Sequence, residues 1–255
     1  MKRKRLWMMI LPLLLGFYSP ANAQTNIQEM YDFNREQFTT TLEGFYPDKW
    51  GSTYFFADIY HPLHDGAVKP TGYYTEIVRR LNFWKESALA PMNIHVEWNG
   101  GQFANNAGLI GAEWFLHSAD YRNTFTFELM YKYIQKAKGN VPLQFTFVWG
   151  MADLFKVKGL LFNGFLDLWG EKVTWTDNLG NNKKTDWVFL SEPQLWYNVG
   201  QHFGCSHLDI GGEVELGYNF SGGWHSGDNF YKNKGVTIAP CLGLRWVFEK
   251  KKDDK

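Results

Sequence analysis

Apolar and polar side chains alternate along several stretches of the chain. In residues 92–99 every even-numbered residue is apolar and every odd-numbered residue is polar. Residues 125–133, 208–220 and 236–248 repeat the alternation with few exceptions. A period of two residues predicts β-strands that place one face in apolar surroundings and the other face in polar surroundings.

Weaker alternation completes a set of about twelve candidate strands. The weaker candidates are residues 25–34, 37–46, 51–60, 72–83, 104–117, 141–150, 157–169 and 186–198. An even number of antiparallel strands is typical of bacterial membrane barrels. The pattern therefore predicts an all-β fold, a transmembrane antiparallel β-barrel of about twelve strands that occupies residues 24–255 as one domain.

The connections between these strands predict an orientation. Three long, turn-rich segments, at about residues 61–71, 170–185 and 220–235, all fall at one end of the barrel. Membrane barrels carry long loops on the outer side and short turns on the inner side, so the first strand is expected to run outward. In this layout Cys205 lies at a strand end and Cys241 near the middle of the next strand, too far apart for a disulfide bond.

The N-terminus has the pattern of an export signal. A basic segment, Lys2-Arg3-Lys4-Arg5, precedes an apolar run over residues 6–18 and the small residues of Ala21-Asn22-Ala23. This order predicts a signal peptide over residues 1–23 that is cleaved before Gln24. The apolar run is too short to span a membrane as a helix.

Composition agrees with a barrel rather than with a soluble exported protein. Aromatic residues form 18% of the chain, yet the mean hydropathy is only −0.36. A strand whose residues alternate between lipid and lumen explains both values. The mean hydropathy is low because the polar lumen-facing residues offset the apolar lipid-facing ones, and the aromatic content is high because aromatic girdles border the apolar band. The net charge of +0 does not favour nucleic acid as a partner.

Four short motifs carry a resemblance to a known family. They are Thr41-Leu42-Glu43, the segment from Asp48-Lys49-Trp50-Gly51 to Asp58, residues 75–81 and Phe103-Ala104-Asn105-Asn106-Ala107. Over its first half the chain resembles the Tsx-type nucleoside-specific channels of the outer membrane. The resemblance implies a monomeric twelve-stranded barrel with a narrow pore, lined by aromatic and ionisable residues that bind nucleosides in transit.

Candidate solute-binding residues are those that place aromatic rings or charges on the polar face. They are Asn163, Phe165, Asp167, Trp169, Glu192, Gln194 and Trp196, together with Glu97, Glu128 and Arg245. A base or sugar stacked on an inward indole would gain about 1–3 kcal/mol. The alternative is a salt-bridged lumen in which the inward rings only fill space.

Other classes of function were weighed against a channel. A lipid hydrolase needs a hydroxyl nucleophile beside a histidine, and neither His95 nor His207, the two histidines clearly within strands, has a serine beside it on the same face. The pairs His61/His64 and Cys205/His207 lack further ligands, so no metal site and no cofactor is expected. A structural or surface-binding barrel would use Trp224, His225 and Tyr231 in the last long loop.

The sequence thus predicts a monomeric, non-enzymatic barrel in the outer membrane of a double-membrane bacterium. It would contact outer-membrane lipid and pass small hydrophilic solutes by passive diffusion, with nucleosides as the first candidates.

Overall fold

The computed structural model describes residues 24–64, 67–102, 104–176, 180–220 and 236–248. Within these residues no helix is long and apolar enough to cross a membrane. The predicted signal peptide, residues 1–23, lies outside the described residues, as do Trp224, His225 and Tyr231 of the last predicted loop.

Almost all of the described chain is β-structure in one sheet. The strands are β1 (Gln24–Asp32), β2 (Gln37–Asp48), β3 (Gly51–His64), β4 (Ala67–Val68), β5 (Gly72–Leu81), β6 (Met92–Gly101), β7 (Ala107–His117), β8 (Asn123–Ile134), β9 (Leu143–Ala152), β10 (Leu160–Thr176), β11 (Asn182–Ser191), β12 (Gln194–Tyr197), β13 (Leu208–Tyr218) and β14 (Val236–Val247). Two short 3₁₀ helices, η1 (Leu154–Lys156) and η2 (Val199–Phe203), lie in connections.

The sheet closes on itself, because the first and last strands pair. In the β1–β14 ladder Asn26 lies opposite Val247 and Asp32 lies opposite Cys241. All other neighbours around the ring are also antiparallel. Among the described residues, closure leaves no free edge strand around the wall. The N–H and C=O groups of the strands can therefore bond to neighbouring strands, as an apolar surrounding requires.

The fourteen strands form twelve staves, by which we mean the twelve strand positions around the barrel wall, and this confirms the predicted number. The short β4 lies off the ring and only extends the end of β3. Strands β11 and β12 form one stave, because both pair with β10 on one side and with β13 on the other. The stave is interrupted at Pro193, which has no N–H to donate to a ladder.

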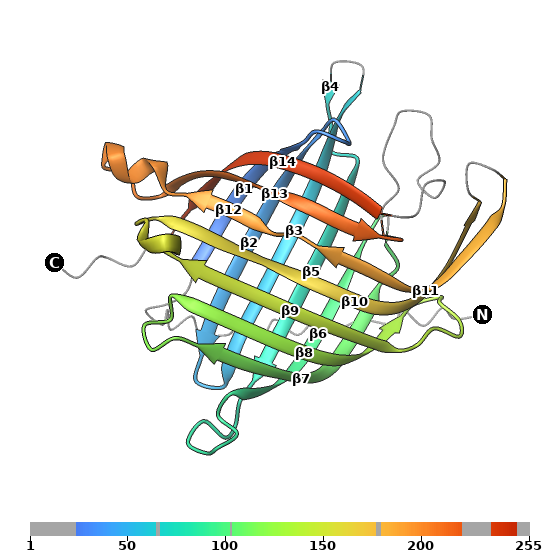
Figure 1. Ribbon diagram of the computed structural model, residues 1–255, viewed down its shortest axis with the longest axis horizontal. Coiled ribbons are helices and arrows are strands. Elements are labelled where there is room, and N and C mark those ends of the chain that lie inside the picture. Colours follow the sequence, from blue (N-terminus) through green and yellow to red (C-terminus); the bar gives the residue numbers. More distant parts are fainter. Residues whose placement is uncertain (1–23, 65–66, 103, 177–179, 221–235, 249–255) are drawn as a thin grey trace, which may run out of the picture.

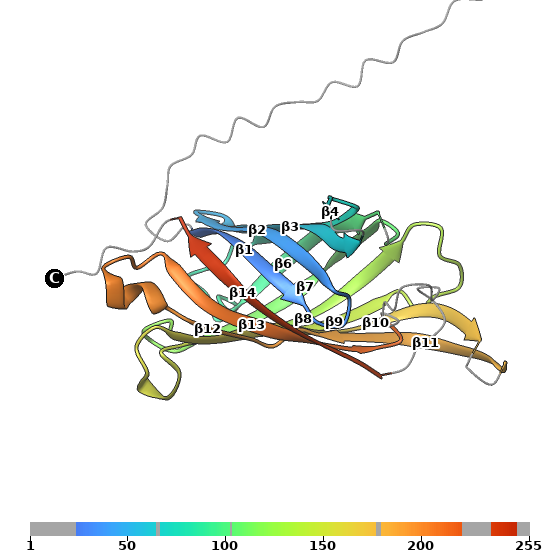
Figure 2. The same ribbon diagram turned by 90° about the horizontal axis from the view of Figure 1, so that it is seen from above.

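The barrel is flattened, so two curved walls face each other across the lumen (Figures 1 and 2). Strands β2 and β3 lie along one long side in the view from above, and β10, β12 and β13 lie along the other. Side chains on these two walls therefore meet inside the barrel although their strands are not neighbours in the sheet.

The outward face carries an apolar band bordered by aromatic rings, as a membrane barrel requires. Exposed residues of the band are Ile27, Leu42, Ile59, Ile77, Val96, Ile110, Leu129, Leu242 and Leu244. Exposed aromatic residues near the end that holds η2 are Trp50, Phe83, Tyr121, Phe155 and Trp246, and those near the other end are Tyr73, Tyr131, Tyr133, Trp187 and Tyr218. The alternation in the sequence assigned these faces correctly.

The predicted connections are partly wrong. Most of the expected loop at 170–185 is strand, because β10 continues to Thr176 and β11 begins at Asn182, and the two form a hairpin beyond the barrel wall (Figure 1). The sequence of this hairpin is mostly polar and rich in turn-forming residues, so alternation did not reveal it. The opposite end is not limited to short turns either, since residues 82–91 form a long connection between β5 and β6.

Both cysteines are free, which agrees with the prediction that they form no disulfide bond.

Candidate functional site in the barrel lumen

The sequence-predicted residues of β10, of β12 and of the interruption before β12 lie on the inner wall of the barrel. Asn163 is opposite Gln194 in the β10–β12 ladder, and its side-chain amide donates to the Gln194 Oε1 at 3.2 Å. Glu192 lies in the interruption between β11 and β12 and is half-buried. Asn163, Phe165, Asp167 and Gln194 are also half-buried, so water in the lumen reaches this part of the wall.

Trp196 is instead completely buried, with no exposed surface. The Arg245 guanidinium carbon lies 4.6 Å from the centre of its ring. Arg245 also donates to Asp209 Oδ2 from Nε at 3.0 Å and from a terminal nitrogen at 2.8 Å. The indole N–H of Trp196 donates to Gln194. A solute can therefore stack on this face only by displacing Arg245.

Trp169 is buried in a similar arrangement nearer the β10–β11 hairpin. The Lys132 ammonium nitrogen lies 4.4 Å from the centre of its ring and donates to Gln144 Oε1 at 2.6 Å. An apolar cluster inside the barrel surrounds the indole, made of Ala107, Leu109, Met130, Ile134, Val188 and Leu190, with Phe165 packed against it. This cluster narrows the lumen toward the hairpin end.

Glu97 and Glu128, the remaining predicted acids, belong to an ionic cluster on β5 to β8. The cluster contains one arginine, Arg80, which contacts Glu113 at 2.5 Å and Glu128 at 3.3 Å. Arg79 lies on the other face of β5 and pairs with Asp48 at the rim. His95 lies among the carboxylates of this cluster.

Acidic side chains dominate the water-accessible middle of the lumen. Asp58 and Glu76 project from one wall, and Asp167, Glu192 and Glu213 project from the other; all are half-buried. Asp58 lies close enough to Glu192 and Glu213 for their charges to interact across the lumen. Glu76 interacts in the same way with Asp167.

The lumen-facing cations offset this acidity only in part. Arg35 acts electrostatically on Glu192 and Glu213 without forming an ion pair with either. Lys132 acts in the same way on Glu76 and Asp167. Arg35, Arg80 and Arg245 form ion pairs with acids other than these five, and Lys132 donates to an amide. None of the five acids forms an ion pair with another described residue; the donors to Asp58, Asp167 and Glu213 are the neutral groups of Thr41, Thr146 and Gln194. The middle of the lumen is therefore an acidic constriction.

Sequence reasoning missed the aromatic residues of the facing wall. Tyr54, Phe56 and Tyr60 share the inward face of β3 with Asp58, and Tyr74 lies inward on β5. The ring centres of Phe56 and Tyr74 are 5.9 Å apart. Aromatic residues occupy both faces of β3, so aromaticity could not identify the inner face, but the position of Asp58 in the alternation could have done so.

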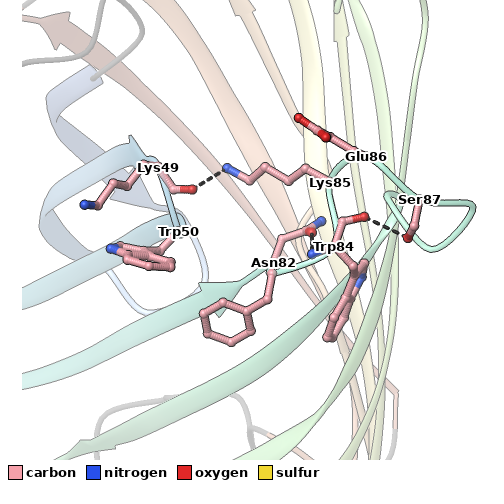
Figure 3. Close-up of a pocket in the computed structure, with 8 residues that line it drawn as sticks. Lys49, Trp50, Asn82, Trp84, Lys85, Glu86 and Ser87 are labelled. Atoms are coloured by element: carbon pink, nitrogen blue, oxygen red, sulfur yellow. Dashed lines mark hydrogen bonds between the residues drawn. The ribbon is translucent and has the colours of Figure 1, made fainter.

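A pocket of about 510 Å³ lies at the barrel end, away from the acidic constriction (Figure 3). The β2–β3 turn and the 82–91 connection form it together, and Lys85 donates to the carbonyl oxygen of Lys49 at 2.8 Å. Trp50 and Phe83, in edge contact at 5.9 Å, are half or more exposed. Exposed rings beside lysines are typical of the membrane–water interface, so we assign this pocket to the aromatic girdle.

One hydroxyl–imidazole pair lies on the outward face, where the sequence showed none. Thr40 Oγ1 is 3.0 Å from His61 Nε2, and it donates to Glu29 Oε2 at 2.6 Å. In a hydrolytic triad the acid orients the histidine, whereas Glu29 contacts the hydroxyl. The prediction that the protein is not an enzyme stays a prediction.

Comparisons with known proteins agree with the fold. Residues 24–248 match the family described as "Domain of unknown function (DUF5020)". No curated protein matches significantly. Among solved structures, the NanC porin is similar with a TM-score of 0.53 and 9% identity, over 87% of this chain and 98% of that chain.

Two further solved barrels have weaker similarity. Outer membrane phospholipase A from Escherichia coli has a TM-score of 0.47 and 11% identity, over 88% of this chain and 96% of that one. The outer membrane protein Omp33 of Acinetobacter baumannii has a TM-score of 0.39 and 10% identity, over 89% and 97%. At these identities, the likeness to NanC shows the barrel fold alone.

Proposed function

Because the chain belongs to the DUF5020 family, whose description names no activity, we propose a function from the lumen. The protein is an outer-membrane channel for the passive diffusion of small hydrophilic solutes. Its acidic constriction admits cationic and neutral solutes in preference to anionic ones.

Three observations support a membrane location. The outward face is an apolar band between two sets of exposed aromatic rings. The chain begins with the pattern of an export signal. The NanC porin shares the barrel fold. Together they favour the outer membrane of a double-membrane bacterium, where closed barrels of this kind reside.

The proposed selectivity rests on the excess of acidic over basic side chains at the constriction. Asp58, Glu192 and Glu213 face each other from opposite walls, and none of them forms an ion pair with a described cation. Arg35 acts on Glu192 and Glu213 only from a greater distance, because its ion pairs are with Asp32 and Glu215. Rings of carboxylates favour cations in a pore. Anions would meet repulsion there, and the low-dielectric walls of a narrow lumen strengthen it.

Nucleosides are the first neutral solutes to test. Phe165 and Phe56 present rings to the lumen from facing walls, and Asn163 and Gln194 offer amide groups beside them. A ring stacked on the base contributes about 1–3 kcal/mol, weak enough for release. The resemblance of the first half of the chain to nucleoside-specific channels points the same way.

The test is the reversal potential of the refolded protein in a planar bilayer under a salt gradient. We expect cation preference in the wild type and a shift toward anions in Glu192→Gln and Glu213→Gln. Glu29→Gln is the matched control, because it removes the same charge from the outward face, where Glu29 is exposed. Nucleosides should also block the current more than sugars of similar size.

The same recordings can contradict the proposal. Anion preference in the wild type would refute the role of the acidic constriction. Absence of any current from folded protein would refute the channel and favour the structural or surface-binding barrel.

A further inference from the structure

The ionic cluster on β5 to β8 contains a buried arrangement of ligands that the channel proposal does not use. His95 on β6, Glu113 on β7 and Glu128 on β8 direct one nitrogen and two oxygens into the same space, with all three atoms within 4.8 Å of one another. We propose that these three residues bind a divalent first-row transition metal ion, with Zn²⁺ as the representative case.

The distances fit such an ion. His95 Nδ1 is 3.5 Å from Glu113 Oε2 and 3.5 Å from Glu128 Oε2. Zinc binds imidazole nitrogen and carboxylate oxygen at about 2.0–2.2 Å in tetrahedral geometry. Two ligands at that distance and angle stand roughly 3.4 Å apart. A spacing of 3.5 Å is at the limit of a direct hydrogen bond, and it is close to the spacing of two ligands that share an ion. The two carboxylate oxygens lie within 4.8 Å of each other.

The imidazole is oriented for this role. His95 is only 1% exposed, and its Nδ1 has no hydrogen-bond partner. On the other side of the ring Nε2 lies 3.0 Å from Glu97 Oε2. When Nε2 donates its proton to Glu97, the lone pair of Nδ1 is directed at the two carboxylates. Metal-binding histidines are commonly held by a carboxylate in this way.

Neighbouring side chains hold both carboxylates. Asn93 Nδ2 donates to Glu113 Oε1 at 2.6 Å, and Arg80 donates to Glu113 Oε2 at 2.5 Å. Because Oε2 is also the oxygen that faces His95 Nδ1, it would bind the ion through its second lone pair while it keeps the hydrogen bond from Arg80. Arg80 also donates to Glu128 Oε1, which leaves Glu128 Oε2 for the ion. Asn99 in turn donates to Glu97 at 2.7 Å. Every ligand thus has a supporting partner, as in established metal sites.

The charges of the cluster also favour a divalent ion. Glu113 and Glu128 are directly opposite each other in the β7–β8 ladder, where like charges are destabilising. With a neutral His95, the carboxylates of Glu97, Glu113 and Glu128 exceed the guanidinium of Arg80 by two negative charges. Lys132 acts on Glu97 without forming an ion pair with it, so a divalent ion would neutralise most of the excess. Three protein ligands leave one position for water or a passing solute.

Sequence spacing could not reveal this site. The ligands come from three strands and lie 18 and 15 residues apart, so no short motif contains them. The earlier expectation of no metal rested on the pairs His61/His64 and Cys205/His207, neither of which takes part.

The test is equilibrium dialysis of chelator-treated, full-length protein in detergent against Zn²⁺, followed by elemental analysis. We expect one Zn²⁺ per chain in the wild type and at least a hundredfold weaker binding in His95→Gln. Co²⁺ should give the absorption bands of a tetrahedral site. His61→Gln is the matched control, because it removes a histidine from the outward face and should bind Zn²⁺ like the wild type.

A second variant separates binding from folding. Glu97→Gln keeps a hydrogen-bonding partner for His95 and should weaken Zn²⁺ binding by about 10–100-fold, with the heat-dependent gel mobility of the wild-type barrel retained. Wild-type protein that binds no Zn²⁺, or equal affinity in the wild type, His95→Gln and Glu97→Gln, would overturn the proposal. The assay needs no ion current, so its outcome is independent of the channel proposal.

Discussion

Arg245 lies over the indole of Trp196 with its guanidinium carbon 4.6 Å from the ring centre, while both residues are almost completely buried. The same guanidinium pairs with Asp209, which is 3% exposed. One arginine of β14 thus covers a ring of β12 and neutralises an acid of β13. This cluster ties three adjacent staves together from the inside.

Loss of this arginine should destabilise the barrel strongly. In Arg245→Met the buried Asp209 carboxylate loses its guanidinium partner and keeps the side-chain amide of Asn198. Breaking a buried ion pair in this way costs about 3–5 kcal/mol of unfolding free energy. Urea unfolding in detergent or bilayers, followed by tryptophan fluorescence, measures this change. Arg79→Gln is the control, since its pair with Asp48 is solvent-exposed and should contribute no more than about 1 kcal/mol. Equal losses in both variants would contradict the role of the buried cluster.

Phe165 should contribute to nucleoside binding more than Trp196 does. Phe165 is half-buried in the lumen, whereas Trp196 is covered by Arg245. We expect Phe165→Ala to weaken nucleoside block of the single-channel current by about 1–3 kcal/mol. Block by a sugar that lacks a base should not change, which makes the sugar an internal control. Unchanged nucleoside block in Phe165→Ala would exclude stacking on this ring.

Arginine on the apolar band should prevent insertion, whereas arginine on the neighbouring lumen position should not. Leu242 is 55% exposed on the outward face, so Leu242→Arg places a charge in lipid at a cost of about 2–4 kcal/mol. Cys241 faces inward, opposite Asp32 and Glu213, which would accept the charge in Cys241→Arg. Folding yield into lipid vesicles, read from heat-dependent gel mobility, distinguishes the two variants. Efficient folding of Leu242→Arg would refute the assigned register.

The β10–β11 hairpin should face the cell exterior and Cys205 the periplasm, if the first strand runs outward. We expect a membrane-impermeant maleimide to label Lys184→Cys on intact cells, with Cys205 and Cys241 replaced by serine. In a Cys241→Ser background, native Cys205 should be labelled only after the outer membrane is opened. Lys184 is exposed in the hairpin, and Cys205 lies between η2 and β13 at the opposite end. The reverse pattern would invert the orientation.

The number of staves was predictable from the sequence, and so was the inner face of the strands in which apolar and polar residues alternate clearly. Lipid and lumen impose opposite polarities on successive residues of a strand. The alternation of apolar and polar residues therefore assigns Ile94 and Leu166 to the outer face, and His95 and Asp167 to the inner face. The prediction of inward rings on β10 and β12 followed from the same rule. Alternation is a weak signal where few residues are apolar, and the β10–β11 hairpin was therefore predicted as a loop.

Contacts between distant residues were decided only by the closed, flattened barrel. The curvature of the sheet brings Asp58 on β3 near Glu192, and the register of β12, β13 and β14 places Arg245 over Trp196. His95, Glu113 and Glu128 converge because the two ladders of β7 place Glu113 opposite Glu128 and His95 opposite Gly111, two residues from Glu113 on the same face. The sequence determined which face each side chain occupies, because that choice is local and depends on the surrounding medium. Partners across the lumen depend on register, closure and curvature, which are properties of the whole sheet.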